Sequence, residues 1–158
     1  MSAITFPNSS LSVSTLGSSE TADFISEKIK ATRQKLEESI SFGQPLNELC
    51  QVYQECRNSD WDGYNAYPVL PDTVSLAHEV LSSLPLGTPS PSFGAEPDGH
   101  ITMEWHHSPF RTLSISISPE KKLHFAALIG ANSYYGTENF YGEISRNIQD
   151  LINRVSKS

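Results

Sequence analysis

The chain has 158 residues, a length that fits one domain with an ordinary buried core. Eighteen acidic residues against eleven basic ones give a net charge of −7, which argues against a surface that binds nucleic acid. The longest purely apolar run, Phe125 to Ile129, is far shorter than the roughly 20 residues that cross a bilayer. We therefore expect no membrane span. No basic residue precedes Lys28, so we also expect no secretory signal and a cytoplasmic location.

Residues 1–21 predict a flexible arm. They contain seven serines and one charged residue, Glu20, and their scattered apolar residues follow no sustained period. The alternation at Leu11 and Val13 would allow one short strand. The pattern becomes regular from residue 22 onward, so we expect a single folded domain over residues 22–158.

Two helices are predicted at the start of this domain. Apolar residues at helical spacing indicate a helix from Ala22 that ends before Gly43, and a second helix that ends near Asn58. The Gly43-Gln44-Pro45 sequence between them predicts a turn, so the two helices would form a hairpin. Cys50 and Cys56 would lie too far apart on the second helix for a disulfide, and we expect both to be reduced and buried.

A loop and a third helix follow. Residues 59–68 contain so many turn-forming and aromatic residues that we expect a structured loop. The third helix is expected to have Asp72 as its N-cap residue and to end before Pro85.

The clearest pattern in the chain predicts an antiparallel meander over residues 100–129. Three segments alternate apolar and polar residues, and turn-forming residues separate them. With the odd-numbered apolar residues on one face, Trp105 pairs with Leu113 and Ile117 pairs with Leu123. A short fourth strand near Phe93 would lie at an edge, because prolines surround it.

The order of these elements predicts an α+β fold with N-terminal helices, a three- to four-stranded antiparallel meander and a C-terminal helix. Thr137 is expected to cap the last helix, whose apolar stripe runs from Ile144 to Val155. The edges of such a sheet stay open to the arm, to the proline-rich segment or to another molecule.

The sequence also resembles a widespread family of small bacterial proteins with no assigned activity. The shared pattern is W-D-G-Y-x-A-x-P over residues 61–68, a helix ending in Leu-Pro, and D-G-x-I-x-x-E-W over residues 98–105. It covers roughly residues 57–155 and leaves out the serine-rich first forty residues. The resemblance implies a cytoplasmic bacterial or phage-borne accessory protein, such as one member of a toxin–antitoxin or defence pair.

Aromatic residues are the main candidates for a protein interface, because tyrosine and tryptophan are its usual anchors. The candidate interface residues are Trp61, Asp62, Tyr64, Tyr67 and Glu104. Asp62 and Asp98 each precede a glycine, where an aspartate typically bonds its own backbone. Glu104 is unusual in mid-strand, and we expect it to accept a hydrogen bond from the Trp61 loop, whereas Trp105 is expected in the core.

A metal site is the alternative interpretation. His100, Glu104 and His106 share one face of a predicted strand, where alternate residues lie about 7 Å apart and can supply ligands to one ion. The neighbouring positions on that face are hydroxyl residues and His124, which favours a polar surface without a bound cofactor. A small metal-dependent or acid–base hydrolase that uses the three residues remains the second hypothesis.

The excess negative charge is concentrated in residues 43–99, which contain eight acidic residues and one basic residue. Such a region attracts a basic partner, or simply aids solubility. We therefore expect a non-enzymatic interaction module that binds a protein partner or a second copy of itself. Inhibition of a co-encoded protein is its most concrete form.

Overall fold

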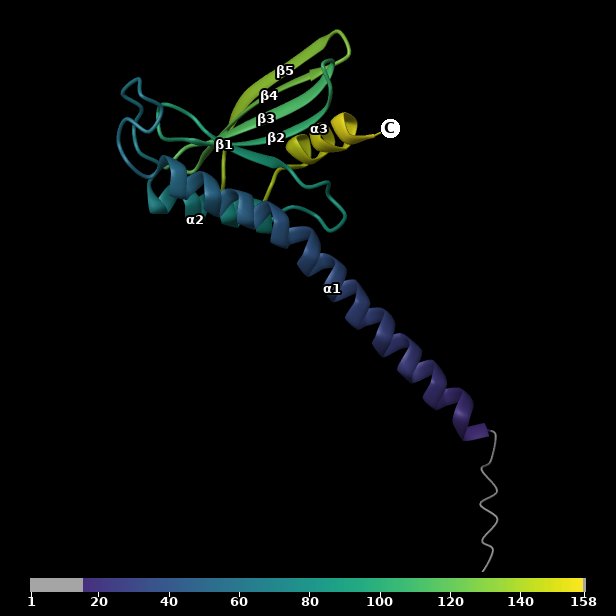
Figure 1. The fold of residues 1–158 in the computed structure, drawn as a ribbon. Helices are drawn as coiled ribbons and strands as arrows, with labels where there is room; N and C mark the ends of the chain where they lie inside the picture. Colours follow the sequence, from purple (N-terminus) through teal and green to yellow (C-terminus); the bar gives the residue numbers. More distant parts are fainter. Residues whose placement is uncertain (1–15, 158) are drawn as a thin grey trace, which may run out of the picture. The chain divides into compact units, whose positions relative to one another are not determined.

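The computed structural model describes the backbone of residues 16–157 and the side chains of residues 22–32 and 43–157. It has an α+β fold, and the chain divides into two units, residues 1–38 and residues 39–158. The elements, in chain order (Figure 1), are α1 Leu16–Cys56, α2 Pro71–Ser82, β1 Ser92–Ala95, β2 Ile101–Ser108, β3 Arg111–Ile117, β4 Lys122–Ile129, β5 Asn132–Asn139 and α3 Arg146–Ser156.

α1 is one continuous helix, so the predicted helical hairpin is wrong. The helix passes through Pro45, which removes one backbone hydrogen bond but does not end the helix. Pro45 and Leu49 are both buried, and this packing in the second unit offsets the lost bond. α1 also includes residues 16–21 of the predicted arm. The rest of that arm, with the possible strand at Leu11 and Val13, lies outside the described residues.

The first unit consists, where it is described, of the N-terminal part of α1. Phe24, Ile25 and Ile29 are exposed there, and the Lys28 ammonium lies 5.2 Å from the centre of the Phe24 ring. The described helices include none long and apolar enough to cross a membrane.

α2 begins two residues earlier than expected. Leu70 is the N-cap residue, with an extended backbone and no side-chain cap, and Pro71 occupies the first turn. Because proline forces the residue before it into an extended conformation, the helix starts at Pro71. Asp72 therefore lies inside the first turn, and the prediction that it caps the helix is wrong.

The sheet is a five-stranded antiparallel meander with the strands in chain order. Trp105 pairs with Leu113 and Ile117 pairs with Leu123, as predicted. One face is buried by α2 and α3, which lie on the same side of the sheet (Figure 1). The buried sheet residues are Phe93, Ile101, Met103, Trp105, Leu113, Ile115, Ile117, Leu123, Phe125 and Ala127. The opposite face carries the polar residues of the alternating pattern.

The fifth strand was not predicted, and it replaces the expected start of the last helix. Thr137 lies in β5 opposite His124, so it does not cap a helix. α3 begins after Ser145, whose hydroxyl accepts a hydrogen bond from the amide of Ile148 at 3.2 Å. β5 has no aliphatic residue on either face, so it lacks the apolar alternation that predicts β2, β3 and β4.

The two cysteines differ in their environment. Cys56 is buried as predicted, whereas Cys50 is exposed, so the prediction of two buried thiols is wrong for Cys50. Burial raises the pKa of the Cys56 thiol, and the charge of Glu55 raises it further.

Candidate functional site

The loop between α1 and α2 is held by aspartate side chains. Asp62 Oδ1 accepts hydrogen bonds from the amides of Tyr64 at 2.8 Å and Ala66 at 3.1 Å. Asp60 Oδ1 accepts one from the amide of Asn65 at 2.8 Å. These bonds fix the backbone of residues 60–66. They confirm that Asp62 bonds its own loop.

The same loop is joined to the hairpin between β1 and β2. The Tyr67 amide donates to the Pro97 carbonyl at 2.8 Å, and the Trp61 indole donates to the Tyr67 carbonyl at 2.9 Å. Gly99 in the hairpin turn has a positive φ of 86°, and a Cβ there would lie 3.0 Å from the Pro68 carbonyl oxygen. The turn therefore needs glycine both for its backbone conformation and for its contact with the loop.

Glu104 does not take part in this connection. It is exposed on β2, between its strand partners Ser92 and Ser114. The Trp61 indole donates to the loop's own backbone instead, so the predicted bond between Glu104 and the Trp61 loop is wrong. The loop is joined to the hairpin by the Tyr67 amide and the Pro97 carbonyl. Both are backbone groups, and no residue pattern in the sequence predicts such a bond.

The fixed loop presents an apolar surface. Tyr64 is 88% exposed, Tyr67 is 70% exposed and Leu70 is 50% exposed. Beside them, a pocket of about 240 Å³ is bordered by Tyr67, Leu70, the hairpin turn and Pro119 from the turn between β3 and β4. We call Tyr64, Tyr67, Leu70 and Pro119 the loop surface.

The candidate interface residues thus have different positions. Tyr64 and Tyr67 belong to the loop surface, while Asp62 holds the loop and Trp61 is half-buried against the core. Leu70 and Pro119 were not among the candidates. Pro119 lies about fifty residues further along the chain, so only the folded sheet brings it beside the loop.

Negative charge borders the loop surface. Asp98 lines the pocket, with its side chain 55% exposed, and Asp72 lies in the first turn of α2. Glu120 follows Pro119, and the nearby Ser118 hydroxyl and the Glu120 backbone amide lower its pKa below the usual value. Glu120 thus adds negative charge beside the loop surface, and Lys121, the next residue in the turn, offsets part of it.

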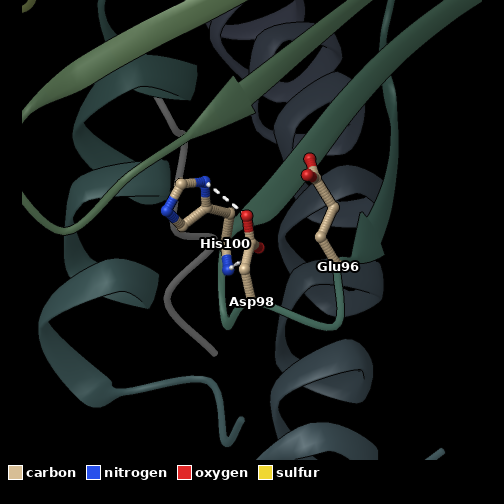
Figure 2. A group of neighbouring side chains, drawn as sticks. All are labelled: Glu96, Asp98 and His100. Carbon is tan, nitrogen blue, oxygen red and sulfur yellow. Dashed lines mark hydrogen bonds and ion pairs between the residues drawn. The ribbon is translucent and has the colours of Figure 1, made fainter. Parts of the chain in front are cut away.

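A second group lies on the hairpin turn. Figure 2 shows Glu96, Asp98 and His100, whose possible ligand atoms lie within 4.8 Å of one another. Asp98 Oδ1 accepts from the His100 amide at 3.1 Å, and Asp98 Oδ2 lies 3.4 Å from His100 Nδ1. Glu96 Oε1 accepts from the Thr102 hydroxyl at 2.6 Å. Contacts within the chain thus account for the position of each of the three side chains.

The predicted metal ligands do not form such a group. Within residues 22–32 and 43–157, Glu96, Asp98 and His100 are the residues with ligand spacing, and Glu104 and His106 are exposed further along β2. His100 instead contacts the outer face of the sheet. Its Nδ1 lies 3.2 Å from Ser116 Oγ, and its ring stacks on that of His124 with centres 6.1 Å apart.

Comparisons with protein-family models, with curated proteins and with solved structures found no match for this chain. The resemblance to the bacterial family therefore rests on the sequence pattern alone.

Proposed function

We propose that this protein is a non-enzymatic interaction module that binds a basic protein partner through the loop surface. The observation that carries this proposal is the exposure of Tyr64 and Tyr67 on a loop whose backbone is held by side-chain hydrogen bonds. Large apolar side chains that stay in water cost free energy, and burial against a partner recovers about 25 cal/mol per Å² of apolar surface.

The fixed backbone of the loop also lowers the entropy cost of binding. Two tyrosines on an ordered backbone have few torsions to restrict when a partner binds, so most of the buried apolar area contributes to affinity. The pocket beside Tyr67 and Leu70 offers a place for one apolar side chain of the partner.

Charge determines the kind of partner. Eight acidic residues and one basic residue lie in residues 43–99, which contain the loop and the hairpin turn. A partner segment with an apolar anchor and flanking lysine or arginine residues complements this surface. A cytoplasmic bacterial or phage protein encoded beside this one, and inhibited by it, is the version that we propose.

The test is co-expression of the full chain with the product of the neighbouring gene, followed by co-purification and titration. We expect a complex that Tyr67→Ala weakens about tenfold or more, whereas Tyr135→Ala, at an exposed tyrosine of β5, leaves it unchanged. Binding should also weaken as salt rises. A complex that is insensitive to Tyr67→Ala would refute the loop surface, and the absence of a complex would refute the co-encoded partner.

The hydrolase hypothesis for His100, Glu104 and His106 has less support, because the described residues do not bring these three together. Incubation with zinc or manganese, followed by measurement of bound metal, separates the two functions. Stoichiometric metal that is lost in Glu104→Ala, with the fold retained, would favour the hydrolase over the interaction module.

A further inference from the structure

The two edges of the sheet differ in how they are protected. β1 has only four residues, prolines lie on both sides of it, and its Phe93 amide donates to the Glu48 carboxylate at 3.1 Å. Short strands, nearby prolines and satisfied backbone groups are devices that prevent pairing with another chain. The β1 edge is therefore closed.

β5 has none of these devices. It is eight residues long, it pairs with β4 without a bulge, and it contains no proline or lysine. Its single charged residue, Glu138, accepts a hydrogen bond from the Asn147 amide group near the start of α3 at 3.1 Å. Among the described strands, only β4 pairs with β5, so the other side of the strand leaves its backbone groups without a strand partner.

We propose that the β5 edge pairs with β5 of a second copy of this chain, antiparallel, to form one continuous ten-stranded sheet. A second copy fits this edge because β5 is complementary to itself. Odd-numbered residues of β5 lie on the outer face of the sheet and even-numbered residues lie on the inner face. A continuous sheet must pair odd with odd residues, which leaves few registers.

The register with Tyr135 on the twofold axis satisfies every position. Outside, Tyr135 stacks on its copy, and Ser133 lies opposite Thr137. Inside, Tyr134 lies opposite Gly136, where the missing side chain leaves room for the ring. Glu138 lies opposite the amide of Asn132, so the two Glu138 carboxylates stay at opposite ends of the interface.

The neighbouring register, centred on Gly136, is less favourable. It places two glycines opposite each other at the centre of the interface, where neither contributes a side chain, and it sets Tyr135 against Thr137. Tyr135 is 83% exposed, and pairing along the β5 edge would cover part of its ring. This inference concerns a different surface from the proposed function and does not depend on it.

The test is the association state of the full chain by sedimentation equilibrium over a concentration series. We expect a reversible dimer. Tyr135→Lys places two charges opposite each other and should raise the dimer dissociation constant at least tenfold, whereas Tyr64→Lys, at an equally exposed tyrosine on the loop, should change it less than twofold. Mixing Tyr135→Lys with Tyr135→Glu should restore a heterodimer.

A cysteine at the axis tests the register directly. In a Cys50→Ser background, Tyr135→Cys should form a cross-linked dimer under mild oxidation, because residues directly opposite have Cβ atoms within reach of a disulfide. Ser133→Cys should cross-link with Thr137→Cys and less with itself. A monomer at millimolar concentration, or a dimer that Tyr135→Lys leaves unchanged, would overturn the proposal.

Discussion

The role of Asp62 in the loop leads to a sharp prediction. Asp62 Oδ1 is the single oxygen that accepts from both Tyr64 and Ala66. Ala66 is only 3% exposed, so in Asp62→Ala its amide loses its hydrogen-bond acceptor and water reaches it poorly. A buried unsatisfied donor costs about 1–3 kcal/mol, whereas the Tyr64 amide, on an exposed residue, is rehydrated at little cost.

We therefore expect Asp62→Ala to lower the free energy of unfolding by about 2 kcal/mol. At a urea slope of about 2 kcal/mol per M, the midpoint would fall by about 1 M. The measurement is urea unfolding followed by circular dichroism and by tryptophan fluorescence, which also reports on Trp61.

Asp62→Asn is the matched control. The amide side chain keeps an oxygen in the same place, so both bonds can persist without the charge, and we expect a loss below about 1 kcal/mol. Equal destabilisation by Asn and Ala would show that charge, and not the shared acceptor, holds the loop. An Asp62→Ala protein as stable as the unmodified chain would refute the account of the loop altogether.

Two further predictions concern packing and thiol reactivity. Gly136→Ala should cost about 1–3 kcal/mol in urea unfolding at low protein concentration, because the new Cβ would lie 2.8 Å from Phe125 Cζ. Gly94→Ala, with nothing within 4 Å of its new Cβ, should change stability by less than about 1 kcal/mol, and equal losses would contradict the Phe125 contact. An aromatic disulfide reagent should modify Cys50 rapidly and Cys56 only on unfolding, since burial protects Cys56 and raises its pKa; two fast thiols in the absorbance trace would refute this.

Local patterns determined much of this fold. Apolar residues at alternate positions predicted β2, β3 and β4, and the same parity placed Trp105 opposite Leu113. This works because one face of each strand is buried by α2 and α3, and burial on one face imposes a period of two on the sequence. The turn-forming aspartates of the loop were equally visible, because an aspartate bonds backbone groups only a few residues away.

Other features of the fold depend on contacts between residues far apart in the chain, and the tertiary structure decided these. α1 continues through Pro45, where Pro45 and Leu49 are buried in the second unit, and β5 forms because β4 supplies its hydrogen bonds. Neither cause leaves a periodic signal in the segment itself. The sequence alone determined that Tyr64 and Tyr67 would lie in a structured loop. Only the fold decided that Pro119 would lie beside them and that β5 would be an open edge, because both depend on which strands pair.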